Sequence, residues 1–403
     1  MTILVALEAR LGRTPDGRIV STTGVDAHPF WQRYLEVFER VLVAARVEPV
    51  ADGPALAPVE GPGVAVRALP AYRGPWQYLR RRAELAHAMR AAVAEADVLC
   101  LRAPGPVAGA AWRLRAGRPF GVEVVGDPED SLSAGAVRSL ARVPARAALA
   151  RDLGAMCREA VAVSYVTRRA LQRRYPTTAW TTSYSSIDLP EEAFATDAEL
   201  AARSARIARP GKGTAADPWR LVTVGTLAQL YKGQDVLIDA LRIARARGLA
   251  AELTIVGDGA CRRALEARAR GGAVHFAGHL PAGAPVRAAL DAADVFVLAS
   301  RGEGLPRALI EAMARGCPGL ATRVGGIPEL LPDDRLVPPG NARALAHALI
   351  RLSARATDLA GLGQRDRTVA RGYHSWVLSE RRREFYRRLR LAAGENVALP
   401  EAG

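Results

Sequence analysis

Short apolar segments alternate with helical patterns along the second half of the chain, and this alternation constrains the fold more than any other feature. The apolar segments are Leu221–Val224, Leu253–Val256, Val274–Ala277, Val295–Ala299, Gly319–Thr322 and Leu336–Val337. Each is followed by a helical pattern, of which the longest cover Lys232–Ala246 and Ala342–Leu352. Short strands that alternate with helices predict βαβ units and a parallel sheet. Ligands of such sheets bind at the carboxyl ends of the strands, so we expect a functional site there.

The first half shows the same alternation less regularly. Strand-like segments lie at Ile3–Leu7, Val41–Ala45, Val64–Arg67, Val98–Leu101, Phe120–Val125 and Ala160–Val163, and helical patterns at Phe30–Val41 and Trp76–Ala94. The polar, Gly- and Pro-rich stretch Ser204–Pro218 is typical of an interdomain linker. We therefore predict an α/β protein with two Rossmann-like, doubly wound domains and a cleft between them. The N-terminal domain is expected over 1–205, the C-terminal domain over 206–372, and a helix within 373–403 is expected to cross back to the N-terminal domain.

Composition excludes several classes of protein. No apolar run approaches the roughly 18 residues of a membrane-spanning helix. The four cysteines (Cys100, Cys157, Cys261 and Cys317) lie far apart without paired spacing, which argues against a disulfide framework or a zinc site. The segment Met1–Glu8 has no basic region and is too short for a signal peptide, so we predict a first strand and a cytoplasmic protein.

The net charge of +15 first suggests a polyanionic partner. However, 54 of the 56 basic residues are arginines spread over both halves, and no aromatic-interleaved basic stripe accompanies them, so we expect no nucleic-acid partner. The arginine-rich segment Arg381–Arg390 carries a narrow apolar stripe of Phe385, Tyr386 and Leu389. This stripe predicts either a C-terminal helix packed on the protein or a weak peripheral contact with anionic lipid.

Two motifs follow the first two strands of the second half. Gly225 and Thr226 come directly after the first strand, and Lys232 opens the helix behind it. Lysine is a compact cation suited to phosphate, and this chain has only two lysines, although a surface lysine remains the alternative. Gly257 and Gly259 form a glycine turn after the second strand, which allows either close approach to a ligand or merely a tight turn.

Two further motifs follow the fourth and fifth strands. In Ser300–Glu311, Pro306 suits the first position of a helix, and the preceding backbone at Gly304 and Leu305 predicts an anion site at its N-terminus. Glu303 precedes this helix, and Glu311 lies roughly 7–8 Å along its axis. This pair suits a sugar–diphosphate–ribose ligand, whereas a loop acid and a solvated glutamate are the alternative. Gly325 and Gly326 open a second short helix, which adds N–H donors for a diphosphate.

These motifs, in this order, resemble those of the retaining GT-B glycosyltransferases of family 4 over about residues 220–352. The resemblance includes Phe276-Ala277-Gly278, Ala293-Asp294-Val295 and the Glu-x7-Glu pair. It implies that the C-terminal domain holds a nucleotide sugar, with Lys232 on the diphosphate, Glu303 on the donor sugar and Glu311 on the ribose. The segment from Gly278 and His279 would reach the base through backbone groups. Catalysis would involve Lys232 and Glu303, with neither a cofactor nor a metal.

The sequence also departs from the family pattern. Thr226 stands where many relatives have arginine, so the diphosphate charge would fall on Lys232, helped by Arg301 or Arg307. The N-terminal domain is poorly covered, and its acceptor-binding candidates are Gly24, Arg102 and Asp127, the last of which is equally consistent with a capping turn.

The resemblance implies a retaining transfer of a sugar from a nucleoside-diphosphate donor, UDP rather than GDP, to a hydroxyl of a small-molecule, secondary-metabolite or envelope-glycan acceptor. A nucleotide-sugar epimerase or hydrolase of the same fold is one alternative. A basic membrane- or nucleic-acid-binding protein is the other.

Overall fold

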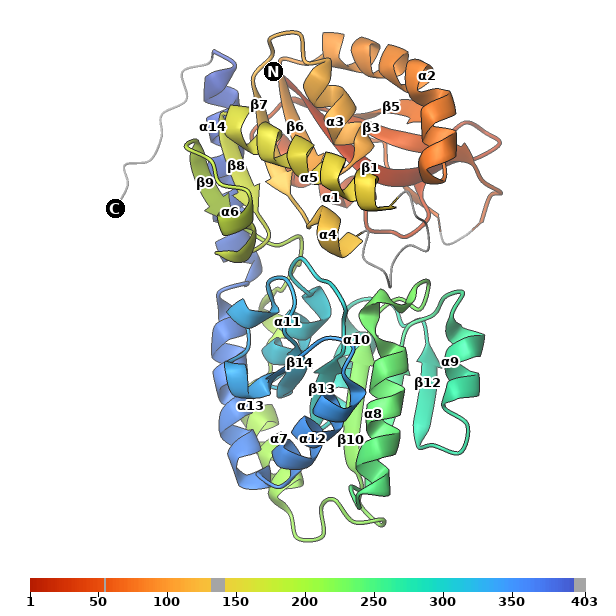
Figure 1. Cartoon of the computed structure of the whole chain (residues 1–403). Coiled ribbons are helices and arrows are strands. Elements are labelled where there is room, and N and C mark those ends of the chain that lie inside the picture. Colours follow the sequence, from red (N-terminus) through yellow and green to blue (C-terminus); the bar gives the residue numbers. More distant parts are fainter. Residues whose placement is uncertain (54–55, 132–141, 395–403) are drawn as a thin grey trace. The chain divides into compact units, whose positions relative to one another are not determined.

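The computed structural model describes residues 1–53, 56–131 and 142–394, and it divides the chain into two compact units. The first unit contains Met1–Pro128, Val143–Tyr184 and the C-terminal helix from Ser379, and the second contains Ser185–Leu378 together with the segment that begins at Glu129 and ends at Arg142. Each unit is a largely parallel β-sheet with helices on its faces, which confirms the predicted α/β class with two Rossmann-like domains (Figure 1). The chain passes from the first unit to the second after Tyr184, about twenty residues before the predicted limit at 205. Residues 395–403 of the predicted C-terminal segment lie outside the described residues.

The first unit contains a sheet whose parallel strands run in the order β5-β3-β1-β6-β7-β8-β9, with β2 and β4 added in antiparallel pairing at the end of β1. Its strands are β1 (Thr2–Arg13), β2 (Ile19–Ser21), β3 (Arg40–Pro49), β4 (Ala57–Pro58), β5 (Val64–Pro70), β6 (Val98–Ala103), β7 (Phe120–Val124), β8 (Ala162–Tyr165) and β9 (Trp180–Ser183). Its helices are α1 (His28–Leu35), α2 (Gly74–Ala94), α3 (Pro106–Arg113), α5 (Arg142–Glu159), α6 (Ala170–Arg174) and most of α14 (Ser375–Ala392). The short α4 (Pro128–Ser131) follows β7 and is assigned to the second unit from Glu129.

The predicted helix over Phe30–Val41 is too long at its C-terminal end. Helix α1 ends at Leu35, and the chain enters strand β3 at Arg40. Val41 and Val43 are completely buried and pair in parallel with Ile3 and Val5 of β1. These β-branched side chains fill the sheet core better as strand residues, so tertiary pairing overrides the helical pattern.

The apolar stripe of the C-terminal helix α14 belongs to the core of the first unit. Phe385, Tyr386 and Leu389 are completely buried. A Cβ atom at Gly121 of β7 would lie 2.5 Å from Leu389 Cδ2, and the ring of Tyr386 stacks on that of Tyr34 at 4.5 Å between centroids. The packed-helix interpretation of this segment is therefore correct, and the stripe is not available to lipid.

The second unit contains a six-stranded parallel sheet in the order β12-β11-β10-β13-β14-β15. Its strands are β10 (Trp219–Val224), β11 (Ala251–Val256), β12 (Val274–Gly278), β13 (Val295–Leu298), β14 (Gly319–Thr322) and β15 (Leu336–Val337). Its α-helices are α7 (Asp197–Ala208), α8 (Gln234–Ala246), α9 (Arg262–Arg268), α10 (Ala284–Ala292), α11 (Arg307–Ala314), α12 (Ala342–Ser353) and α13 (Ala356–Arg371). Short 3-10 turns lie at η1 (Glu191–Ala193), η2 (Leu230–Lys232), η3 (Ile327–Glu329) and η4 (Asp333–Arg335).

The stretch Ser204–Pro218 lies inside the second unit and is not an interdomain linker. Its first residues complete helix α7, which begins with a reciprocal capping box between Thr196 and Glu199. Ile207 is buried in the core of this unit. The side chain of Lys212 is also buried, with its Nζ 2.6 Å from Asp294 Oδ2. The polar, glycine-rich stretch is therefore a folded turn that a buried ion pair stabilises.

Candidate functional site

The strand order of the second unit defines where a ligand site belongs. Strand β10 lies between β11 and β13, so the chain winds outward from it in both directions. Crevices at the carboxyl ends of strands form at such a switch point. The loops that follow β10 and β13 carry Lys232 and Glu303, and these two side chains meet there.

Lys232 and Glu303 form an ion pair, with 2.7 Å between Lys232 Nζ and Glu303 Oε1. The hydroxyl of Ser300 donates a second hydrogen bond to the same oxygen, also at 2.7 Å. The side chains of Lys232 and Glu303 are 16% and 8% exposed. The structure thus brings together, from positions 71 residues apart, the two residues that the sequence assigns to catalysis.

The loop after β10 requires glycine directly after Lys232. Gly233 has φ +71°, and a Cβ atom there would lie 1.9 Å from the carbonyl oxygen of Ala299. A Cβ atom at Gly225 would lie 3.5 Å from Lys232 Cγ, so the lysine stem passes directly over this glycine. Gly233 therefore fixes the turn behind Lys232, and the lysine stem packs over Gly225.

Arg301 holds the Lys232 loop in place. Its guanidinium binds both carboxylate oxygens of Asp235, at 2.8 and 2.7 Å, and also donates to the carbonyl of Leu230. Its backbone N–H donates to the carbonyl of Tyr231 at 2.7 Å. Burial raises the pKa of Asp235, but the hydrogen bond and charge of Arg301 outweigh it and lower this pKa below its ordinary value. Arg301 is thus committed to positioning the loop, which argues against the predicted help to a diphosphate, whereas the exposed Arg307 forms no ion pair within the described part of the chain.

The glycine turn after β11 packs against the Lys232 loop. Gly257 has φ +142°, and a Cβ atom there would lie 1.9 Å from the Gly225 carbonyl oxygen. Gly259 has φ +153°, and its Cβ atom would lie 2.2 Å from the nitrogen of Ala228. Contact between the two loops alone explains both glycines, so the turn shapes the loop that carries Thr226 and Lys232.

The loop after β13 and the loop after β14 also pack against each other, through backbone contacts at glycines. Gly326 donates its backbone N–H to the Gly304 carbonyl at 2.8 Å. A Cβ atom at Gly325, with φ +51°, would lie 1.5 Å from the carbonyl oxygen of Glu303. Leu305 and Pro306 then lead into α11, which begins at Arg307, within a residue of the predicted start. Backbone N–H groups at a helix N-terminus favour an anion, and this one lies beside the Lys232–Glu303 pair in sequence and fold.

Glu311 is the second carboxylate of the Glu-x7-Glu pair noted in the sequence. It lies on α11, is half-buried, and its side chain forms no hydrogen bond or ion pair with any residue that the structure describes. Burial raises the pKa of Glu311, although the charges of Arg307 and Arg287 oppose this effect. An unpaired, partly desolvated acceptor is suited to bind hydroxyl donors of a ligand.

The remaining donor-side candidates lie at the end of β12. Gly278 is the last residue of that strand, with φ +74°, and the next residue, His279, is exposed. His279 lies close enough to Asp258 to lower its pKa slightly, after the larger effects of the Gly259 backbone N–H and Arg262. Within the described ranges, no three His, Cys, Asp or Glu side chains are grouped so that they could hold a metal ion.

The three candidates in the first unit have different surroundings. Gly24 lies in an exposed loop after β2. Arg102 on β6 forms an ion pair with the buried Glu123, and Asp127 accepts a hydrogen bond from Tyr175 at 2.9 Å and pairs with Arg174. The contacts of Arg102 and Asp127 favour structural roles, and sequence reasoning missed Glu123, Arg174 and Tyr175 because nothing local marks them as partners.

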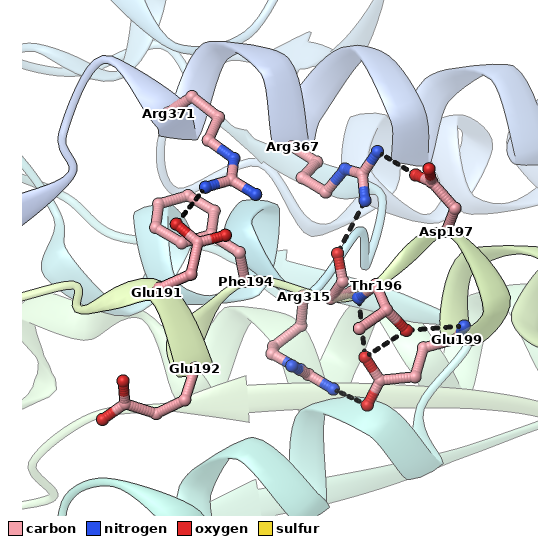
Figure 2. A pocket seen from close by; sticks show the side chains of 10 residues that line it. Glu191, Glu192, Phe194, Thr196, Asp197, Glu199, Arg315, Arg367 and Arg371 are labelled. Atoms are coloured by element: carbon pink, nitrogen blue, oxygen red, sulfur yellow. Dashed lines mark hydrogen bonds and ion pairs between the residues drawn. The ribbon is translucent and has the colours of Figure 1, made fainter.

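A separate open pocket of about 740 Å³ lies near the C-terminal end of α11 (Figure 2). Three arginines line it, and each is paired with an acid: Arg371 with Glu191, Arg367 with Asp197 and Arg315 with Glu199. The backbone N–H of Thr196 and then Arg315 lower the pKa of Glu199 to about 2, so this pair is ionised over the physiological range. Since its cations are already neutralised, the pocket is not an anion site, and no sequence motif points to it.

The fold places the chain in the GT-B class of glycosyltransferase structures. It is similar to the sucrose-phosphate synthase of Thermosynechococcus elongatus, with a TM-score of 0.68, 21% identity, and coverage of 97% of this chain and 100% of that one. It is also similar to HepE of Anabaena, determined in complex with UDP and glucose, with a TM-score of 0.62, 19% identity, and coverage of 95% and 98%.

Sequence comparison adds a match to a family. Residues 218–355 match the model of the glycosyl transferases group 1, which confirms the resemblance to GT4 over this part of the chain. Over 155 residues it is 37% identical to the amylovoran biosynthesis glycosyltransferase AmsK of Erwinia amylovora. That match covers 35% of this chain and 38% of AmsK, so it spans less than half the length of the relative.

Proposed function

We propose that this protein is a retaining glycosyltransferase that transfers a sugar from a nucleoside-diphosphate sugar to an acceptor hydroxyl. The observation that carries the proposal is the Lys232–Glu303 pair at the switch point, with the unpaired Glu311 nearby on α11. The match of residues 218–355 to the glycosyl transferases group 1 supports the reaction class. The UDP and glucose bound in HepE support a UDP-sugar as the donor.

The proposed roles follow from the charges of these residues. The ammonium of Lys232 has three donor hydrogens, so it can bind diphosphate oxygens while it keeps Glu303 in place. Glu303 would accept hydrogen bonds from hydroxyls of the donor sugar, and Glu311 from those of the ribose. Gly278 and His279 would approach the base through backbone groups. Thr226 and the glycines at 225, 257 and 259 would shape the surrounding loops.

The chemical step depends on the stabilisation of the leaving group. The bond between the anomeric carbon and the diphosphate breaks, and negative charge develops on the departing phosphate. A fixed cation and backbone N–H groups at this point stabilise that charge without reorganisation. The departing phosphate can take the proton of the acceptor hydroxyl on the face where that hydroxyl attacks, so retention needs no protein nucleophile.

For the acceptor, we propose a glycan or glycan precursor of the cell envelope. The support is the similarity to AmsK, a glycosyltransferase of amylovoran biosynthesis. The sequence alone also left small-molecule acceptors open, and the described contacts of Arg102 and Asp127 do not favour either acceptor.

A panel of UDP- and GDP-sugars, incubated with and without candidate acceptors, tests this function. Transfer predicts sugar consumption that depends on the acceptor, with the anomeric configuration kept in the product. Rapid stoichiometric epimerisation without any acceptor would instead establish the epimerase alternative. A thermal-shift screen of the same nucleotides identifies the base, because a ligand that binds only the native state raises apparent stability.

Replacement of Glu311 by glutamine is expected to raise the donor KM by about tenfold, equivalent to about 1.4 kcal/mol, and to stabilise the protein at neutral pH. Burial raises the folded-state pKa of Glu311 above its ordinary value of 4.5. Its protonated form therefore adds stability that is fully present below pH 4.5 and is lost as the pH rises through the folded-state pKa. The melting temperature of the glutamine variant, relative to the wild type, should thus increase from pH 4 to pH 8. A constant difference across this range, together with an unchanged KM, would show that Glu311 is solvated and outside the site.

A further inference from the structure

The open pocket near the C-terminal end of α11 exposes carboxylates rather than arginines (Figure 2). The side chain of Arg367 is 13% exposed, whereas that of its partner Asp197 is 89% exposed. Arg315 and Glu199 show the same order, at 5% and 50%. Arg367 is also bound to the backbone, because it donates to the carbonyl of Ala195 at 2.6 Å. The arginines therefore hold the carboxylates in place, and the carboxylate oxygens face solvent as preorganised hydrogen-bond acceptors.

Two further acids line the pocket. Glu191 pairs with Arg371 at 2.6 Å, and this hydrogen bond lowers the pKa of Glu191, so its carboxylate is ionised at neutral pH. Glu192 is exposed, and its side chain forms no hydrogen bond or ion pair with any residue that the structure describes. Four acids and three arginines line the pocket, which leaves a net charge of only −1. Since no described group of acids and histidines could hold a metal ion, these acceptors are suited to neutral hydroxyl donors.

An exposed tryptophan lies beside the pocket. The ring of His374 stacks on that of the pocket residue Phe194, with 5.5 Å between centroids, and its Nε2 lies 3.2 Å from Glu191 Oε2. The ring of Trp376 lies 6.3 Å from the ring of His374, and Trp376 is 66% exposed. The backbone N–H of Trp376 donates to His374 Nδ1 at 3.2 Å, which fixes the tryptophan backbone next to these residues. Apolar area and carboxylates thus adjoin on the second unit.

We propose that this pocket, with Trp376 at its edge, binds the uncharged sugar residues of a glycan strand. Sugar hydroxyls donate hydrogen bonds to carboxylates, and such charge-assisted bonds are roughly twice as strong as neutral ones. The C–H groups on one face of a pyranose ring pack on the face of an indole ring, which removes apolar area from water. The pocket volume of about 740 Å³ lies within the usual range of about 300–1,000 Å³ for ligand sites.

Other ligands suit this surface less well. The exposed carboxylates repel the phosphates of a nucleotide, and the arginines cannot compensate because each is already paired. A peptide segment offers few hydroxyl donors. A charged lining does not suit an acyl chain, and no helix in the described part of the chain is long and apolar enough to cross a membrane. A polymer with several hydroxyls and one apolar face per ring matches both the carboxylates and the tryptophan.

The pocket is separate from the switch point. It lies near the C-terminal end of the eight-residue helix α11, about 12 Å along the axis from the end that faces the Lys232–Glu303 pair. A strand bound here keeps a glycan on the enzyme between successive transfers. This role rests on the proposed function, because it takes the bound strand to be the acceptor or its product.

Native electrophoresis of the full chain through gels that contain dextran, mannan or galactan tests the proposal. These polymers are neutral, so the net charge of +15 does not attract them. We expect at least one of them to retard the wild type in the absence of any donor. Trp376→Ala should raise the dissociation constant about tenfold or more, and Glu192→Gln about fivefold. Since both side chains are exposed, melting temperatures should match the wild type.

Two matched controls isolate the pocket. Trp76→Ala removes an exposed tryptophan of α2, and Glu252→Gln changes an exposed glutamate of β11, both outside the pocket. These controls should migrate like the wild type. The proposal is overturned if none of the three polymers retards the wild type, or if Trp376→Ala and Glu192→Gln bind as tightly as their controls.

Transfer assays keep this proposal distinct from the proposed function. Because the gels contain no donor, retardation without any transfer activity would refute the proposed function alone. Transfer to a short acceptor without retardation would refute the glycan site alone. Where both are present, Trp376→Ala should leave kcat with a short acceptor unchanged and raise the KM of a long glycan acceptor about tenfold.

Discussion

Replacement of Lys232 by methionine is expected to lower kcat/KM for the nucleotide-sugar donor by about a hundredfold, or about 2.7 kcal/mol of transition-state stabilisation. The methionine stem can occupy the space over Gly225 that Lys232 Cγ and Cδ fill at 3.5 and 3.6 Å from a Cβ atom there. The variant therefore removes the charge and keeps the packing. Steady-state kinetics with a saturating acceptor measure the effect, and a decrease of less than tenfold would exclude Lys232 from charge stabilisation.

The ion pair with Glu303 requires a second variant as a control. With Lys232 gone, the largely buried carboxylate of Glu303 keeps only the Ser300 hydroxyl as a side-chain partner among the described residues, and an uncompensated buried charge destabilises the fold. The double variant Lys232→Met with Glu303→Gln removes both charges and should recover the melting temperature, but not activity. Arg263→Met, on the exposed surface of α9, controls for the loss of a cation.

Binding measurements show whether Lys232 contacts the diphosphate or only supports the structure of its loop. The Lys232 variant should weaken nucleoside-diphosphate binding much more than nucleoside binding, because only the diphosphate contacts the cation. Equal weakening of both ligands would indicate that Lys232 merely supports the loop after β10.

The backbone of the candidate site in the second unit could be predicted because its close loop contacts require glycine. Gly233, Gly257 and Gly325 occupy positions where a Cβ atom would collide with the backbone of the neighbouring loop. Such positions admit no other residue, so the glycines mark the loop contacts in the sequence itself. Regular alternation of strands and helices then puts these loops at one edge of one sheet.

Side-chain pairing could not be predicted in the same way. Arg301 and Arg307 are the same residue type in the same motif, yet one is bound to Asp235 and the other is exposed. Lys212 lies in a stretch with the composition of a linker, and only the fold brings it to Asp294. Ion-pair partners that are this distant in the sequence leave no local pattern. Because the chain has 54 arginines, the presence of an arginine also does not indicate which acid it pairs with.

Arg102 shows the consequence for the first unit, where the sequence predicted an acceptor contact. Its guanidinium pairs with Glu123, which is 2% exposed. The same carboxylate accepts hydrogen bonds from the phenols of Tyr184 at 2.8 Å, Tyr386 at 3.2 Å and Tyr34 at 3.3 Å. Burial, followed by the charge of Glu123, raises the pKa of all three tyrosines well above the ordinary value, so they stay protonated as donors. One carboxylate thus joins β7, α1 and α14.

Replacement of Arg102 by methionine is therefore expected to destabilise the first unit by about 3 kcal/mol, because it leaves Glu123 as a buried charge without a cation. The melting temperature should drop by about 6 °C or more. Adding Glu123→Gln to this variant removes the uncompensated charge and should recover most of the loss, whereas a simple packing defect would not be rescued. A methionine variant that melts like the wild type would contradict this structural role. A raised acceptor KM in the double variant, once its melting temperature has recovered, would show that Arg102 also contacts the acceptor.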